Sequence, residues 1–254
     1  LQPAVDALQQ ALRHNPQLAE ARNNLGNLLI AQGRIAEAIE HLRSATQLRP
    51  TSADFHYNLA NALHKHGEPE AALSSYRESL RLNPNGAETH NNLGAVYKLL
   101  EQYEQAEQAC RRAVALSPDY AEAHSNLGAV LLQMQQFDQA AACFRLALEL
   151  QPNRAELHYG LGKSLQFAQQ YDAAADCYQR ALSRNPKHAR ACFGLGAIHT
   201  QAGRLDEASA LYSQGLEIEP DHASAWSELG RLSARGGEPQ QAIAGFARQP
   251  AQPG

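Results

Sequence analysis

Residues 87–120 read AETHNNLGAVYKLLEQYEQAEQACRRAVALSPDY, and most of the chain repeats this pattern. The proline near the end of this stretch is one of seven that lie 34 residues apart, at positions 16, 50, 84, 118, 152, 186 and 220. Successive periods follow one another without a net insertion or deletion. A fixed period of this length indicates a repeat protein, in which each copy packs on its neighbours instead of folding into a separate globule.

Within one copy, apolar and small residues follow two helical periods. When the proline is counted as position 32, positions 4, 7, 8 and 11 share one helix face, and positions 17, 20, 24 and 27 share another. Position 8 is glycine or alanine in every copy, position 20 is alanine, and position 24 is mostly a large side chain. Because small residues let helix backbones approach, each copy is predicted to be a pair of packed helices that ends at the proline.

The start of the first helix also has a sequence signal. A polar residue follows the proline in several copies, and a glutamate comes three residues later, as in a capping box. In that arrangement a polar side chain accepts a hydrogen bond from an N–H group of the first helical turn. We therefore predict side-chain caps at three helix starts: Asn85 with Glu88, Asp119 with Glu122, and Asn153 with Glu156.

The period and the pattern W/H-x-x-L-G-x-x-L/Y … A-x-x-x-F/Y-x-x-A … P resemble the tetratricopeptide repeat (TPR) family over essentially the whole chain. The resemblance implies an all-α fold, a right-handed superhelix (α-solenoid) of antiparallel helix pairs. First helices would line a concave groove and second helices would form the convex back. The expected parts are the second helix of a truncated repeat (1–18), full repeats (19–52, 53–86, 87–120, 121–154, 155–188, 189–222), a shortened repeat (223–248) and a tail (249–254).

Composition excludes several classes of partner. A net charge of −4 provides no basic surface for a phosphate backbone, so we expect no nucleic acid. The apolar runs are too short to span a bilayer, so we expect no membrane partner. Four cysteines without a C-x-x-C pair predict buried free thiols in a reducing, cytoplasmic compartment. Scarce lysine and abundant alanine favour a bacterial source.

Asparagines recur where the TPR family lines its groove. In that family, positions 2, 5, 6, 9, 12 and 13 of the first helix face the groove. A side-chain amide both donates and accepts, so a row of amides can bind the backbone of an extended peptide without reading its sequence. The alternative is that asparagine at position 6 merely tolerates the helix crossing. The predicted peptide-binding residues, which we call the asparagine ladder, are Asn24, Asn58, Asn92 and Asn126 at position 6, with Asn27 and Asn61 at position 9.

Position 2 forms an acidic row, for which two interpretations stay open. Acidic residues in a first turn stabilise a helix through its dipole by about 0.3–1 kcal/mol each. As a groove rim they would favour a ligand with basic residues. The predicted rim is Glu20, Asp54, Glu88 and Glu122. The carboxylate clamp of the family's chaperone-tail receptors is not expected, because position 5 holds no lysine.

Other chemical motifs have a structural explanation. His56, His90, His124 and His158 recur at position 4 but lie 34 residues apart on successive helices, so we predict packing residues and no metal site. The segment 162–164 (Gly-Lys-Ser) lacks the first glycine of a phosphate-binding loop. The uninterrupted register leaves only short turns in which to build a catalytic site. We therefore predict no enzyme activity and no cofactor.

The predicted function is a protein–protein interaction scaffold that binds a protein or extended peptide in its concave groove through the asparagine ladder. Two alternatives remain. The ladder resembles the TPR superhelix of O-linked N-acetylglucosamine transferases, which implies a possible role as the substrate-recruiting arm of a larger glycosyltransferase-like enzyme. The second alternative is a self-assembling structural module, with self-association through the truncated N-terminal end.

Overall fold

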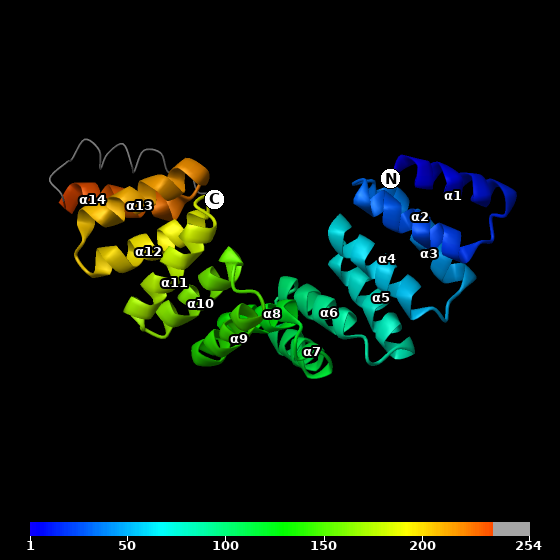
Figure 1. The fold of residues 1–254 in the computed structure, drawn as a ribbon, viewed down its shortest axis with the longest axis horizontal. Helices are drawn as coiled ribbons and strands as arrows, with labels where there is room; N and C mark the ends of the chain where they lie inside the picture. The colour runs from blue at the N-terminus through cyan, green and yellow to red at the C-terminus, as the bar shows by residue number, and fades with distance from the viewer. Residues whose placement is uncertain (236–254) are drawn as a thin grey trace. The chain divides into compact units, whose positions relative to one another are not determined.

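The computed structural model describes residues 1–235, which form fourteen α-helices and no strand (Figure 1). The chain divides into two compact units, Leu1–Val130 (unit 1) and Leu131–Gly254 (unit 2). The predicted all-α fold of tandem helix pairs is confirmed. The second half of the shortened repeat and the tail 249–254 lie outside the described residues. Every helix in the described part is too short or too polar to cross a bilayer.

The helices of each unit are 13 or 14 residues long and are joined by short turns. The helices that begin in unit 1 are α1 (Gln2–His14), α2 (Ala19–Ala31), α3 (Ile35–Leu48), α4 (Ala53–His66), α5 (Pro69–Leu82), α6 (Ala87–Leu99), α7 (Tyr103–Leu116) and α8 (Ala121–Gln133). Unit 2 contains α9 (Phe137–Leu150), α10 (Ala155–Phe167), α11 (Tyr171–Arg184), α12 (Ala189–Gln201), α13 (Leu205–Ile218) and α14 (Ala223–Arg235). Each predicted full repeat therefore contains two helices.

The small residue at position 8 lies against the side chain at position 24 of the same helix pair. A β-carbon on Gly26 would lie 2.6 Å from Cγ of Leu42. One on Gly162 would lie 2.9 Å from the ring of Tyr178. On the facing helix, the position-20 alanines from Ala38 to Ala208 are fully buried. The predicted close approach of the two helices is confirmed, and it leaves no room for a larger residue at position 8 without rearrangement.

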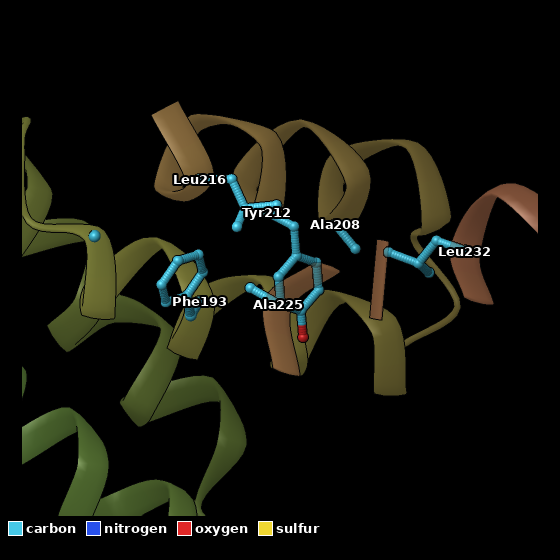
Figure 2. Packing of buried hydrophobic residues seen from close by; sticks show 7 residues of the cluster. Phe193, Ala208, Tyr212, Leu216, Ala225 and Leu232 are labelled. Carbon is cyan, nitrogen blue, oxygen red and sulfur yellow. The ribbon is translucent and has the colours of Figure 1, made fainter. Parts of the chain in front are cut away.

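The last described helices share one apolar cluster in unit 2. Figure 2 shows Phe193 of α12, Tyr212 of α13 and Leu232 of α14 within this cluster, and all three are buried. The rings of Phe193 and Tyr212 are stacked, with centroids 6.3 Å apart. Side chains from three consecutive helices therefore form this layer of the core, as expected for a repeat protein whose copies are stable only against their neighbours.

The four cysteines form no disulfide. Cys110, Cys177 and Cys192 are buried, as predicted, whereas Cys143 is only half-buried. Burial raises the pKa of the Cys177 and Cys192 thiols. Since the thiolate is the reactive form, these two residues serve as apolar packing groups.

The predicted side-chain caps at Asn85 and Asn153 are wrong. Helices α6 and α10 begin after Gly86 and Arg154, and neither N-cap makes a side-chain hydrogen bond. Asn85 Oδ1 instead accepts a hydrogen bond from Arg112 at 3.1 Å. The third predicted cap, Asp119, accepts a hydrogen bond from the Ser117 hydroxyl at 2.9 Å. The polar residues that follow the prolines therefore lie one position too early to cap these helices.

Asparagine before the proline stabilises the turn between repeats. Its Oδ1 accepts a hydrogen bond from the backbone N–H two residues later, which is an Asx turn. The three pairs are Asn15 with Gln17 (3.0 Å), Asn83 with Asn85 (3.3 Å) and Asn185 with Lys187 (3.1 Å). This bond closes the turn across the proline, which cannot donate a backbone hydrogen bond of its own.

The turn inside several helix pairs contains one residue in the left-handed conformation. It is glycine at Gly33, Gly67 and Gly203, but it is Glu101, Gln135 and Gln169 in three other repeats, where φ is 57°, 59° and 61°. A β-carbon on any of the three glycines would meet no atom within 4 Å. The choice of residue therefore changes stability through backbone conformation alone.

We expect Gly203→Ala to lower the free energy of unfolding by about 1 kcal/mol, because alanine is strained at a φ of 76°. Gln169→Gly is the matched reverse change. It should raise the free energy of unfolding by less than about 1 kcal/mol, since relief of strain is partly offset by the greater entropy of the unfolded chain. Urea unfolding followed by circular dichroism measures both. A Gly203→Ala variant with an unchanged free energy of unfolding would contradict this explanation.

Candidate functional site

Four of the six ladder residues line one cavity on unit 1. This cavity has a volume of about 430 Å³ and also contacts Ile30, His64 and Lys65. Its amides come from the first helices of three successive repeats, α2, α4 and α6. The four are Asn27, Asn58, Asn61 and Asn92. Positions 6 and 9 therefore lie side by side in space, as the TPR resemblance implied.

A second cavity on unit 1 shares Asn58 with the first. Its volume is about 630 Å³, and its lining includes Asn23, Tyr57 and the predicted rim residues Asp54 and Glu88. Asn58 is half-buried, so one side of its amide contacts protein while another side remains accessible. The two cavities meet at this side chain and together form the candidate peptide-binding groove.

The ladder amides are hydrogen-bonded across repeats, which the sequence analysis missed. Asn58 Nδ2 donates to Oδ1 of Asn23 at 2.9 Å, and Asn126 Nδ2 donates to Oδ1 of Asn91 at 2.9 Å. Both acceptors occupy position 5 of the preceding repeat and are buried, with exposed fractions of 7% and 3%. Each buried amide therefore fixes the orientation of the ladder amide on the first helix of the next repeat.

Asn92, the ladder residue between Asn58 and Asn126, also bonds to position 5 of the preceding repeat, but there the partner is a tyrosine. Asn92 Nδ2 donates to the hydroxyl of Tyr57, again at position 5 of the preceding repeat, at 3.2 Å. It also donates to Oδ1 of Asn61 at 3.0 Å, and the Tyr76 hydroxyl donates to the same oxygen at 2.5 Å. The Tyr57 hydroxyl in turn donates to Glu88 at 3.3 Å. The spacing that reveals these rungs in the sequence is 35 residues, between position 6 and the preceding position 5.

These bonds decide what the ladder can offer to a ligand. One N–H of Asn58 and of Asn126 is used within the protein, which leaves the second N–H of each amide. The Oδ1 atoms of these two residues accept no hydrogen bond from the described part of the chain. Asn24, at the start of the ladder, is exposed and accepts only a long hydrogen bond of 3.4 Å from Asn23. At Asn58 and Asn126 the ladder therefore presents oriented amides, each with a free N–H and a free Oδ1.

The tyrosine hydroxyls of this network remain protonated donors. Burial raises the pKa of Tyr57 and of Tyr76. Burial, together with the nearby Glu122 carboxylate, raises the pKa of Tyr120 to about 12. The Tyr120 hydroxyl lies 3.3 Å from Nδ2 of Asn91. At neutral pH all three groups therefore carry their protons and no charge.

The acidic residues at position 2 lie in the first turns of α2, α4, α6 and α8, where a negative charge stabilises the helix. Glu20 forms an ion pair with Arg49, and its pKa is lowered by its own backbone N–H and by this arginine. Asp54 and Glu88 also line the 630 Å³ cavity. The helix-stabilising position thus applies to all four residues, and for all four the rim interpretation stays a prediction.

The position-4 side chain binds the backbone carbonyl of the proline that ends the preceding repeat. The Nε2 atoms of His56, His90, His124 and His158 lie 3.0, 3.1, 2.8 and 3.0 Å from the oxygens of Pro50, Pro84, Pro118 and Pro152. Trp226 Nε1 donates to the carbonyl of Pro220 at 2.8 Å. A carbonyl only accepts, so each histidine holds its proton on Nε2. Between residues 1 and 235, no three potential metal ligands lie together.

Models of the tetratricopeptide repeat match the sequence almost from end to end. One matches residues 1–44, 168–227 and 200–253. A second matches residues 86–153 and 119–187, and a third matches residues 53–85. A related model, described as a TPR repeat, matches residues 26–67. No curated protein matches the sequence.

Solved structures share the fold at low identity. The pilF protein of Pseudomonas aeruginosa is 26% identical, with a TM-score of 0.73 over 85% of this chain and 97% of that chain. A chain of the APC/C hetero-tetramer Cut9–Hcn1 is 19% identical, with a TM-score of 0.78 over 91% of this chain and 45% of that one. YrrB, described as a TPR protein with an unusual peptide-binding site, is 24% identical, with a TM-score of 0.61 over 78% and 97%. The last two show the fold alone.

We expect Asn91→Ala to lower the free energy of unfolding by about 1–3 kcal/mol, because it removes a buried acceptor and leaves the amide of Asn126 without its partner. The exposed Asn24→Ala is the matched control and should change it by less than about 0.5 kcal/mol. Urea unfolding measures both variants. Equal effects would show that the buried amide does not couple the repeats.

We also expect unit 1 to lose stability in mild acid. Burial holds the pKa of His41, His64 and His90 below the usual 6.5, and His41 Nδ1 is buried without a hydrogen-bond partner. The unfolded chain therefore takes up protons first as the pH falls through 6.5, which favours unfolding.

The measurement is the free energy of urea unfolding between about pH 7.5 and about pH 5.5, a window above the titration of ordinary carboxylates. Stability should fall as the pH is lowered, and His64→Gln should reduce this loss. A free energy of unfolding that stays constant or rises on acidification would contradict the prediction.

Proposed function

Since the chain belongs to the tetratricopeptide repeat family, a family of protein-interaction scaffolds that are generally not catalysts, we propose that unit 1 binds an extended segment of a partner protein through the asparagine ladder. The single observation that carries this proposal is the cavity lined by Asn27, Asn58, Asn61 and Asn92. Four amides converge on one accessible space, and an amide suits a peptide backbone because it both donates and accepts.

Orientation of the amides supports binding of a backbone. Asn58 and Asn92 are held by hydrogen bonds to position 5 of the preceding repeat, at 2.9 and 3.2 Å. Since these side chains are already ordered, a ligand would not have to immobilise them, and less conformational entropy is lost on binding. The second N–H of Asn58 is then available for a carbonyl oxygen of the ligand, whereas Nδ2 of Asn92 donates to both Tyr57 and Asn61.

The spacing of the rungs fits an extended chain. Neighbouring packed helices lie about 8–10 Å apart, and an extended peptide advances about 3.3 Å per residue. One rung therefore corresponds to about three residues of the ligand. Contacts at this interval are made by the backbone whatever the side chains are, so the ladder would supply affinity with little sequence preference.

Charge supplies the selectivity that the amides lack. Asp54 and Glu88 line the cavity beside Asn58. The first turns of α2 and α8 add Glu20 and Glu122 to the same row. A segment with basic residues flanking its extended core is therefore the ligand that we propose for unit 1. The recruiting-arm and self-assembly alternatives stay predictions.

The test begins with a photoreactive amino acid at position 27, which is exposed within the cavity. The segment that it crosslinks is then synthesised as a peptide, and its Kd is measured by calorimetry. Asn58→Ala and Asn92→Ala should each weaken binding by about three- to tenfold, as expected for the loss of one or two hydrogen bonds.

Asn153→Ala is the matched control, since this asparagine is exposed and lies in unit 2, outside the ladder. Its Kd should equal that of the unaltered protein. If the two ladder variants are folded and bind the peptide as tightly as this control, the ladder is not the binding site.

A further inference from the structure

Unit 2 has a cavity of its own, and its chemistry differs from that of the ladder. Its volume is about 760 Å³, and residues of the five helices from α10 to α14 contribute to its lining. Phe193 and Tyr212, which pack together in Figure 2, both reach its wall. Position 6 is Gly160 and Gly194 in this unit, so the amides of the ladder have no counterpart in these two repeats.

Aromatic rings occupy the space that position-6 side chains would need. A β-carbon on Gly160 would lie 2.5 Å from the ring of Phe144, and one on Gly194 would lie 2.5 Å from the ring of Tyr178. The Tyr178 hydroxyl donates to Gln166 at 2.6 Å, and its ring lies 6.0 Å from that of Tyr159. The cavity wall therefore presents aromatic rings where unit 1 has the position-6 asparagines.

One of these rings is largely exposed. Phe167, at the end of α10, has an exposed fraction of 54%, which is unusual for so large an apolar side chain. Its ring stacks on that of Phe137 with centroids 5.3 Å apart. Stacking fixes the ring in place, and the accessible part of it lines the cavity. A fixed, exposed ring is a suitable surface for another aromatic group.

The charge of the cavity is positive where unit 1 is acidic. Lys163 and Arg190 both line it, and neither forms an ion pair with a carboxylate in the described chain. Lys163 Nζ lies 5.9 Å from the centroid of the Phe167 ring. Arg190 occupies position 2, which is acidic in unit 1. The one carboxylate of the lining, Glu228, is paired with Arg231 at 3.1 Å.

We propose that this cavity is a second binding site, specific for an acidic peptide segment that carries an aromatic side chain. The aromatic ring of the ligand packs against Phe167 and Tyr159, and carboxylates on either side of it pair with Lys163 and Arg190. Two unpaired cations beside an exposed ring match such a ligand in both charge and shape. The site uses residues of unit 2 alone and does not rest on the asparagine ladder.

The probe is a blocked pentapeptide, Asp-Glu-Phe-Glu-Asp, titrated into the complete chain by calorimetry. Two further peptides separate the two parts of the proposal. Replacing the phenylalanine by alanine should weaken binding about fivefold, the value of one aromatic contact. Replacing the four acids by their uncharged amides, asparagine and glutamine, should abolish binding, because the pairing with the two cations is lost. Equal binding of the acidic and the amide peptides, or no binding of the acidic one, would overturn the proposal.

Variants of the protein locate the site. Lys163→Gln combined with Arg190→Gln should weaken binding of the acidic peptide about tenfold, and Glu228→Gln should strengthen it. Arg180→Gln is the matched control, because Arg180 is an exposed cation of the same unit that lines a different cavity. An unchanged affinity in the folded double variant would also overturn the proposal. The Asn58→Ala variant should bind this acidic peptide with unchanged affinity. The test of the unit 2 site therefore does not depend on whether the asparagine ladder binds a ligand.

Discussion

The side chain at position 24 constrains what each repeat can present on its groove face. It lies over the small residue at position 8 of its own repeat, as Leu42 does over Gly26 and Tyr178 over Gly162. In unit 2 it also covers position 6 of the next repeat, where Tyr178 leaves no space for a side chain at residue 194. The repeats in which position 24 is Leu42, Tyr76 or Cys110 are followed by an asparagine at position 6. At Gly160 and Gly194, close packing against the rings of Phe144 and Tyr178 leaves no room for an amide.

The binding residues of unit 1 are also interface residues. Asn58 and Asn126 donate to buried amides of the preceding repeat, so the same side chains couple neighbouring helices and face the groove. In a repeat protein, stability is approximately a sum of terms between neighbours. A buried amide such as Asn91 needs its partners because an unsatisfied polar group is costly in the interior. This requirement gives asparagine at position 6 a structural role besides any role in binding. The peptide-binding interpretation and the structural interpretation of this asparagine are therefore compatible.

Much of the fold was predictable because it depends on local spacing. The period of 34, the small residues at positions 8 and 20 and the prolines predicted the helix pairs, and α2, α4 and α6 begin at Ala19, Ala53 and Ala87. The capping box was wrong because its polar residue lies one position too early, where it is bonded elsewhere. The position-4 histidines were expected only to pack, and their bonds to the proline carbonyls were missed because these bonds depend on how the chain turns between repeats.

The sequence by itself determined the repeat, the all-α class and the row of asparagines on the first helices, since each of these follows from residue types at fixed intervals. Only the tertiary structure decided which atoms of those asparagines are used within the protein, because a hydrogen bond between Asn126 and Asn91 depends on how two helices pack. It also brought Lys163, Phe167 and Arg190 to one cavity. Lys163 and Phe167 are four residues apart on α10, so the sequence already places them on one helix face, but only the packing of α12 beside α10 brings Arg190 next to them.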